Sequence, residues 1–166
     1  MADKTTKTNT MRLLDSRKVH YAVHHYAAER MSAEEVAATL GFPQEQVFKT
    51  LVTLPDKGRP FLAIIPAGRE LDLKKLAQAA GEKRVRMATY REAESLTGLQ
   101  VGGISALALL GKGFKVFLDI LANDQAQVLV SAGQRGIQLQ LAPQDLAQVT
   151  GARVADISRP MGQETD

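Results

Sequence analysis

Three histidines and two serines are the first side chains of this sequence whose types and spacing could support chemistry. His20, His24 and His25 lie close together, but on a strand His20 and His24 share one face while His25 points to the other. No carboxylate joins them at metal-ligand spacing. A serine nucleophile needs a neighbouring general base, and neither Ser105 nor Ser131 stands in a Gly-x-Ser-x-Gly elbow. These residues therefore predict neither a metal centre nor a Ser-His triad.

The sequence contains no cysteine. This excludes a disulfide framework, a thiolate zinc site and a cysteine nucleophile supplied by the enzyme. The lack of disulfides fits a reducing compartment.

Two glycine-containing loops and one lysine leave a functional and a structural interpretation open. Gly102 and Gly103 favour an unusual backbone conformation, which would suit either an anion or a tight turn, although the P-loop and Rossmann spacings are absent. Arg135, between two glycines, fits a hairpin turn or an anion site. Lys49 has apolar neighbours, so its ammonium is either desolvated or extended to solvent.

The elements that must position these residues are predicted from periodicity and cap signals. Capping boxes at Ser32 and Thr89 and a cap at Asp72 mark helix starts, and the continuously apolar segment 61–66 indicates a central strand. The pattern predicts a single α+β domain with a mixed, mostly antiparallel, barrel-like sheet and helices packed outside. Helices are expected at 10–18, 33–40, 73–80, 90–96 and 142–151, and strands at 19–25, 48–54, 61–66, 83–87, 114–118, 126–131 and 137–141.

Composition supports one cytoplasmic domain. The chain has 166 residues, 45% of them apolar, and a net charge of +3, which tolerates a polyanion without requiring one. No segment approaches the roughly 18 consecutive apolar residues of a membrane span, and the polar start lacks a signal sequence. We expect a disordered tail at 1–9, the domain at 10–159 and a polar tail at 160–166.

Four segments, in order and spacing, resemble the YbaK/EbsC family, which is related to the editing domain of bacterial prolyl-tRNA synthetase. They are 47–51, 71–75, 101–105 and 130–136, and the resemblance covers roughly residues 10–159. It implies a trans-editing hydrolase that deacylates cysteinyl-tRNA(Pro), because a synthetic site sized for proline rejects cysteine or alanine poorly. In this family the thiol of the mischarged cysteine is thought to attack its own carbonyl, so the protein would supply position and electrostatic stabilisation.

The same resemblance implies the partners and leaves two alternatives open. The expected partners are the 3′ end of tRNA(Pro) and prolyl-tRNA synthetase, in a ternary complex, with no cofactor, metal or membrane. One alternative keeps the enzyme and changes the substrate to alanyl- or another small aminoacyl-tRNA. The other is a non-catalytic protein that binds tRNA or a nucleotide in the same pocket.

Site residues are carried over from the family by position. Lys49 would hold the 3′-terminal adenosine or its ester as a fixed positive charge, and the backbone amides of Gly102 and Gly103 would face the reacting carbonyl. Ala106 departs from the proline usual in this loop, which predicts a less rigid loop. Gln138 stands where some relatives have aspartate, and a neutral amide pairs less well with an ammonium. The expected substrate-binding residues are Tyr26, Thr50, Ile104, Ser105, Ser131, Gly133, Arg135 and Gln138.

Overall fold

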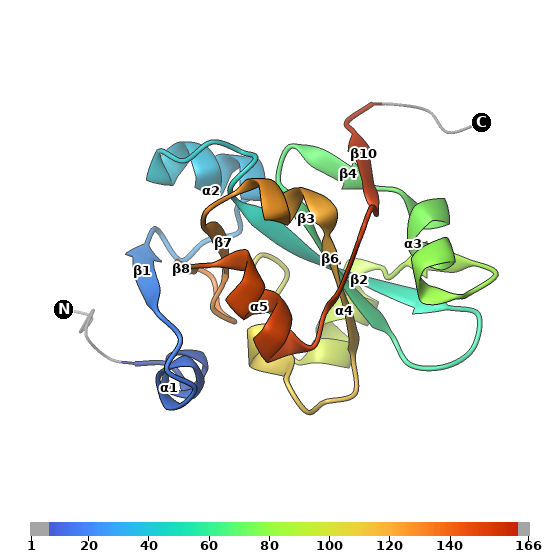
Figure 1. Ribbon diagram of the computed structural model, residues 1–166, viewed down its shortest axis with the longest axis horizontal. Coiled ribbons are helices and arrows are strands. Elements are labelled where there is room, and N and C mark those ends of the chain that lie inside the picture. Colours follow the sequence, from blue (N-terminus) through green and yellow to red (C-terminus); the bar gives the residue numbers. More distant parts are fainter. Residues whose placement is uncertain (1–6, 163–166) are drawn as a thin grey trace.

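The computed structural model describes residues 7–162, and in them short helices surround one main sheet (Figure 1). The α-helices are α1 (Asn9–Ser16), α2 (Ala33–Leu40), α3 (Leu73–Ala80), α4 (Tyr90–Thr97) and α5 (Pro143–Thr150), with 3₁₀ turns η1 (Leu107–Leu109) and η2 (Ile120–Asp124). The strands are β1 (Tyr21–His25), β2 (Phe48–Pro55), β3 (Phe61–Pro66), β4 (Arg69–Leu71), β5 (Val85–Met87), β6 (Lys115–Asp119), β7 (Val128–Ser131), β8 (Ile137–Leu141), β9 (Arg153–Ala155) and β10 (Ser158–Pro160).

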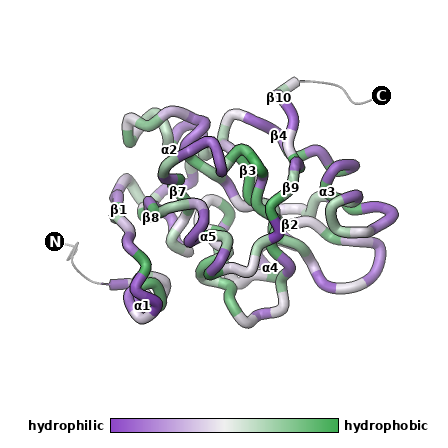
Figure 2. The backbone as a smooth tube through the Cα atoms, in the orientation of Figure 1, coloured by the Kyte–Doolittle hydropathy of each residue, from purple (hydrophilic) through white to green (hydrophobic). Residues whose placement is uncertain are grey.

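The main sheet contains five strands in the order β5-β2-β3-β6-β9. Strand β2 is antiparallel to β3 and β5, whereas β6 is parallel to β3 and β9. Every residue of β3 is buried, and the strand forms a strongly hydrophobic run in the middle of Figure 2. The central position predicted for segment 61–66 is therefore confirmed, since only a strand covered on both faces is apolar throughout.

Alternate residues of β3 supply two separate cores, because successive side chains of a strand point to opposite faces. Leu62 and Ile64 belong to the larger cluster, which is shared with α1, α5, β7 and β8. Ala63 and Ile65 belong to a smaller cluster beneath α3. The sheet is thus covered on both faces. Strand β5 pairs only with Thr53–Pro55, so the first residues of β2 extend beyond it.

The predicted fold class is confirmed, but the strands of residues 7–162 do not close into a barrel. They form three sheets: the main one, a three-stranded sheet β1-β8-β7 and a pair β10-β4. Closure requires every edge strand to find a partner, and here β5 and β9 end the main sheet. The mixed, mostly antiparallel character is confirmed, since only β3–β6 and β6–β9 among the named strand pairs are parallel.

The helix starts are those that the cap residues predict. The side chains of Ser32 and Thr89 accept hydrogen bonds from the backbone of Glu35 and Glu92, which complete capping boxes on α2 and α4. Asp72 caps α3 by accepting from the Lys75 backbone. These bonds satisfy N–H groups that a helix start leaves unpaired, so local chemistry sets these boundaries.

The strands β4, β9 and β10 were not expected from the sequence. Each has three residues, which is too short for a periodic signal. They are fixed by the buried Asp119, whose carboxylate accepts hydrogen bonds from the Ile157 backbone at 3.0 Å and the Ser158 hydroxyl at 2.9 Å. Ser158 then pairs with Leu71 across β10 and β4. The chain is therefore tied to the sheet up to Pro160.

The remaining boundaries shift by a few residues at most. The first helix begins at Asn9, and the first strand begins at Tyr21 rather than at 19. The predicted tails at 1–9 and 160–166 lie largely outside the described residues, so they stay predictions. Among residues 7–162, no helix has both the length and the apolar character needed to cross a bilayer.

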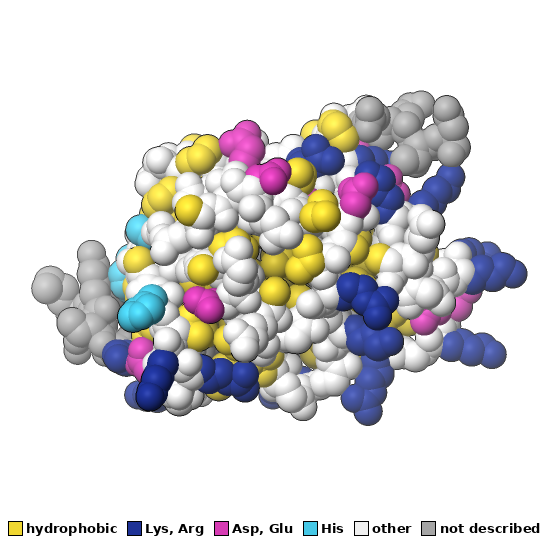
Figure 3. Space-filling model, in the orientation of Figure 1, with side chains coloured by type: hydrophobic (Ala, Val, Ile, Leu, Met, Phe, Trp, Pro, Cys, Tyr) yellow, Lys and Arg dark blue, Asp and Glu magenta, His cyan; other side chains and the backbone are white. Residues whose placement is uncertain are grey.

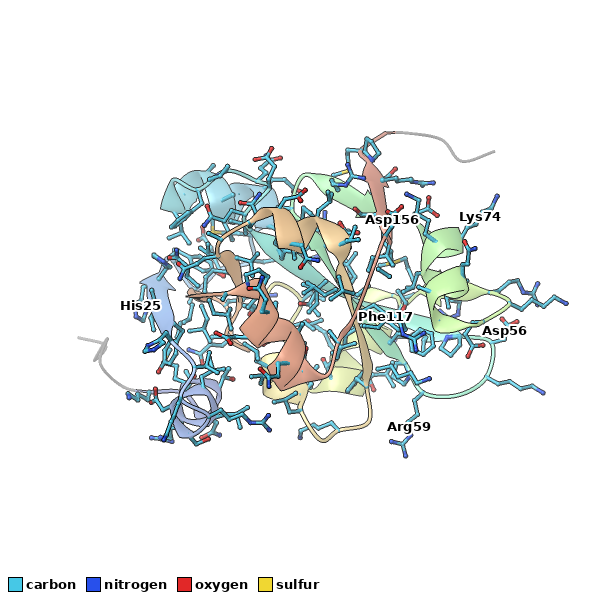
Figure 4. All side chains as sticks on the ribbon, in the orientation of Figure 1. His25, Asp56, Arg59, Lys74, Phe117 and Asp156 are labelled. Carbon is cyan, nitrogen blue, oxygen red and sulfur yellow. The ribbon has the colours of Figure 1, made fainter. Side chains whose placement is uncertain are left out.

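Charged side chains gather at the margins of the molecule. Figure 3 shows histidines over β1 on one edge and lysines and arginines over α3 and the β2–β3 connection on the other. In Figure 4, His25 lies at the edge formed by β1, far from Lys74 and Asp56 on the opposite side.

Candidate functional site

A cavity of about 290 Å³ lies between the start of α2, strand β2, the start of α4, the loop before η1 and the strands β7 and β8. The elements that surround it can be followed in Figure 1. It unites six residues predicted for the site: Lys49, Thr50, Gly102, Ile104, Ser131 and Gln138. The volume lies near the lower end of the range for small-molecule sites, which is roughly 300–1,000 Å³. It suits a small acyl group better than a whole nucleotide.

Lys49 is a half-buried cation held by two partners. Its Nζ atom donates a hydrogen bond to the carbonyl oxygen of Ala67 at 3.0 Å and lies 3.4 Å from Oε1 of Glu34, with 23% of the side chain exposed. An ammonium has three N–H donors, so these contacts leave one for a ligand. The lysine is therefore fixed at the pocket rather than extended into solvent.

The glycine loop contributes Gly102 to the pocket and keeps Gly103 behind it. Gly102 has a φ of +94°, a conformation that side chains disfavour. The amide of Gly103 donates to the carbonyl of Gln100 at 2.8 Å, so it already has an acceptor within the loop. A Cβ on Gly103 would come within 2.9 Å of the backbone of Gln134. Gly103 therefore allows close loop packing, while Gly102 is the glycine that lines the pocket.

Arg135 joins the two loops instead of lining the cavity. Its Nε donates to the carbonyl oxygen of Val101 at 2.9 Å, and its side chain lies against Gly102. Gly133 also stands behind the pocket, with its amide donating to the Ser131 hydroxyl oxygen at 3.2 Å. Both residues hold the pocket wall in place.

Gln138 presents an unsatisfied acceptor. Its Nε2 donates to the hydroxyl of Tyr26 at 3.4 Å, whereas its Oε1 is buried and has no hydrogen-bond partner among the described residues. Such an atom costs about 1–3 kcal/mol when left unpaired. Tyr26 itself does not line the cavity and acts behind Gln138. The amide oxygen is therefore a candidate acceptor for a ligand donor.

Ile104 and Ser105 divide their roles. Ile104 lines the pocket, while the buried Ser105 accepts a hydrogen bond from the Ala108 backbone at 3.3 Å and supports the start of η1. Ala106, where the family has proline, adopts a φ of −63°. This is close to the value that proline would impose, so the backbone at this position is one that proline would also adopt.

The lining also contains residues that were not found from the sequence, among them Glu34, Met87 and Tyr90. Glu34 pairs with Lys49, and Met87 and Tyr90 stand at the mouth of the cavity. The signal for Glu34 was its place in the first turn of α2, beside the Glu35 that completes the cap. No sequence pattern indicated Met87 or Tyr90, because the sequence does not show which side chains are exposed beside the cavity.

The mouth is held by an ion pair between β5 and α4. The two guanidinium nitrogens of Arg86 donate to the two carboxylate oxygens of Glu92 at 2.9 and 2.8 Å, and the Thr89 backbone donates to the same carboxylate at 2.9 Å. The hydrogen bonds from Arg86 and then from Thr89 lower the pKa of Glu92 to about 2. The residues between Arg86 and Glu92 are thus fixed in place.

The histidines take no part in this site. Nε2 of His24 lies 2.7 Å from Oε1 of Gln140, and its ring meets Phe42 edge to face. Within the described part of the chain, no cluster of three or more histidine or acidic side chains has the arrangement of a metal site. His24 and His25 belong to the three-stranded sheet, and His20 directly precedes its strand β1.

Comparison with known proteins places the chain in a family. Residues 27–149 match the model of the aminoacyl-tRNA editing domain. An Enterococcus faecalis protein with the provisional name Cys-tRNA(Pro)/Cys-tRNA(Cys) deacylase EbsC is 41% identical over 162 residues, 95% of this chain and 98% of that protein. The proline–tRNA ligase of Nitratidesulfovibrio vulgaris (strain Hildenborough) is 34% identical over 107 residues, which are 64% of this chain and 18% of the ligase.

Solved structures share the fold over nearly the whole chain. A crystal structure of a hypothetical protein has a TM-score of 0.82 at 28% identity and covers 89% of this chain and 97% of its own. A crystal structure provisionally described as a trans-editing enzyme for prolyl-tRNA synthetase has a TM-score of 0.76 at 26% identity and covers 93% and 99%. The chain therefore belongs to the aminoacyl-tRNA editing domain family, which confirms the resemblance to YbaK-type proteins and the hydrolase class that it implies.

Proposed function

We propose that this enzyme is a trans-editing deacylase of mischarged tRNA(Pro), with cysteinyl-tRNA(Pro) as its main substrate. The observation that carries the proposal is the meeting of Lys49, Gly102 and Ser131 in one small cavity. A fixed ammonium beside a bare stretch of backbone suits an ester whose carbonyl oxygen gains negative charge during cleavage. The name of the Enterococcus faecalis relative, which includes cysteinyl-tRNA(Pro), supports the choice of amino acid.

In the proposed reaction the nucleophile comes from the substrate. The thiolate sulfur of the esterified cysteine attacks its own carbonyl carbon, so that a C–S bond forms and the C–O bond to the ribose breaks. The ribose oxygen takes a proton, and water then opens the resulting β-thiolactone to free cysteine. Lys49 would hold the ester and Gly102 would face its carbonyl oxygen, so the pocket supplies orientation and charge.

The surroundings of Ser131 support this route over a serine nucleophile. The hydroxyl oxygen of Ser131 accepts a hydrogen bond from the Gly133 amide, and no histidine is among the described residues that line the pocket. The nearby carboxylate of Glu34 pairs with Lys49. A serine without a general base is a weak nucleophile at neutral pH.

A partnership with prolyl-tRNA synthetase completes the proposal. The similarity to part of proline–tRNA ligases supports a shared substrate, and the net charge of +3 suits weak binding of tRNA by the enzyme alone. In a ternary complex the synthetase would supply recognition of the tRNA body. Such a reaction belongs to translation, which keeps the cytoplasm as the expected compartment.

A panel of charged tRNAs tests the proposal under single-turnover conditions. Cysteinyl-tRNA(Pro) should lose its amino acid fast, and alanyl- and seryl-tRNA(Pro) slowly, because neither offers a thiol. Cysteinyl-tRNA(Cys) shows whether the tRNA body matters, and adding prolyl-tRNA synthetase should accelerate only the tRNA(Pro) substrates. Equal rates for cysteine and alanine would favour the alternative of a general small-aminoacyl deacylase. Stable binding without turnover of any ester would favour a non-catalytic protein.

A further inference from the structure

Two large apolar residues are exposed at the mouth of the cavity. Met87, in the edge strand β5, is 41% exposed, and Tyr90, the first residue of α4, is 62% exposed. Both line the cavity. The guanidinium carbon of Arg30, from the loop before α2, lies 4.7 Å from the centre of the Tyr90 ring. Arg30 and Tyr90 thus form a cation–π pair beside the cavity that Met87 also lines, and we call these three residues the mouth platform.

The mouth platform is held ready by the structure beneath it. The bidentate ion pair between Arg86 and Glu92 joins the residues that flank Met87 and Tyr90 along the chain, and the capping box of Thr89 fixes the start of α4. An aromatic ring on such a rigid base loses little conformational freedom when it binds a ligand. A ring that served only the core would instead be buried.

The chemistry of the platform suits unpaired nucleic-acid bases. Bases stack on aromatic rings and on guanidinium planes, and an arginine adds attraction to the phosphate backbone. Arg30 lies over one face of the Tyr90 ring, and the high exposure of the residue leaves most of the rest open. The thioether of Met87 can pack against the edge or face of a base.

The size of the cavity places such bases at the platform. A cavity of about 290 Å³ accommodates an acyl group and its ester more readily than a nucleoside with its neighbours, so the bases next to the ester must leave through the mouth. We propose that Tyr90, Arg30 and Met87 form a stacking site for the unpaired bases at the 3′ end of the RNA substrate. The identity of the RNA rests on the proposed function, whereas the stacking site itself does not require turnover.

A fluorescent RNA tests this site without using catalysis. The probe is the trinucleotide CCA with 2-aminopurine in place of the terminal adenine, whose fluorescence is quenched when it stacks. Wild-type protein should quench the probe, and Tyr90→Ala should weaken its binding by roughly 5- to 150-fold. Tyr90→Phe should retain binding because it keeps the ring. Leu96→Ala, an exposed apolar residue on the same helix, is the matched control and should change nothing.

The outcomes separate this inference from the proposed function. An unquenched probe with wild-type protein, or equal binding by wild-type and Tyr90→Ala proteins, would overturn the stacking site even if cysteinyl-tRNA(Pro) is hydrolysed. Quenching that depends on the ring would support the site even if no ester is cleaved. A loss of synthetase binding in Tyr90→Ala without a loss of RNA binding would assign the platform to a protein partner and overturn the proposal.

Discussion

The amide of Gln138 is bonded on one side only: its Nε2 lies 3.4 Å from the hydroxyl oxygen of Tyr26, while its buried Oε1 has no hydrogen-bond partner among the described residues. The contact is long for a hydrogen bond, and only 5% of Gln138 is exposed. An aminoacyl substrate carries an amino group that could donate to Oε1. A substrate amino group that donates a hydrogen bond to this oxygen would therefore remove the cost of leaving it unpaired.

Replacing Gln138 should separate stability from activity. In Gln138→Leu the unpaired oxygen disappears, so the free energy of unfolding should stay level or rise by up to about 1–3 kcal/mol. The catalytic efficiency should fall roughly 10- to 150-fold, because a hydrogen bond to a charged amino group is worth about 1.5–3 kcal/mol. Urea unfolding and deacylation kinetics measure the two effects. Gln138→Asp is the second variant and should lower KM at neutral pH. A destabilised Leu variant with full activity would contradict the assignment.

Removing the ammonium of Lys49 should slow deacylation. We expect Lys49→Ala to lose on the order of 100-fold in kcat, the effect of removing one donor that faces developing charge. Lys75→Ala is the matched control, since Lys75 also donates to a backbone carbonyl oxygen (Ser158) and pairs with a carboxylate (Asp156). Single-turnover assays on both variants decide the matter. Equal rates for wild type and Lys49→Ala would refute the role of this lysine.

Adding a methyl group to Gly103 should damage the site through loop packing. The new Cβ of Gly103→Ala would lie 2.9 Å from the backbone of Gln134, so we expect a loss of about 1–3 kcal/mol in the free energy of unfolding and slower turnover. Gly111→Ala is the control, because Gly111 has a φ of +77° and nothing within 4 Å of its Cβ position. It should cost about 1–2 kcal/mol through backbone strain alone, with activity intact. Thermal unfolding and kinetics compare the two.

Glu92 should stabilise the protein in a pH-dependent manner. Its pKa is lowered to about 2 in the folded protein, from an ordinary value of 4.5. At a pH between these two pKa values, Glu92 takes up a proton when the protein unfolds. The stabilisation is therefore present above pH 4.5 and lost as the pH falls toward 2. The melting temperature of Glu92→Gln should lie below that of wild type at pH 7, and the gap should close toward pH 2. Added salt should narrow the gap because the pair is exposed. A gap independent of pH would rule out the charge effect.

Helix starts and the central strand were predictable because their signals are local. The caps at Ser32, Asp72 and Thr89 and the apolar run of β3 depend on neighbours within a few residues. The failure to close a barrel and the short strands β4, β9 and β10 depend on which distant edges pair. Such pairings involve Asp119 and Ser158, which lie far apart in the sequence. Strands of three residues are too short to show a periodic pattern, so these pairings could not be predicted.

Site residues that lie in the family segments could be predicted from the sequence. The family segments supplied Lys49, Gly102 and Ser131, which the structure brings to one cavity. The partition into residues that line the cavity and residues that support it was not predictable, because Gly103 and Arg135 belong to the same segments as the lining residues. Tyr90 belongs to no motif, and only its exposure beside the cavity identifies it.

The cavity draws its walls from β2, from the loop before η1 and from the strands β7 and β8, which the ribosome makes in that order. A nascent chain that has emerged only as far as β6 carries Lys49 and the glycine loop but lacks Ser131 and Gln138. The lining of the cavity is therefore complete only once β8 has been added to the chain. We expect a chain truncated after β6 to lack deacylase activity, although it would retain Lys49 and Gly102.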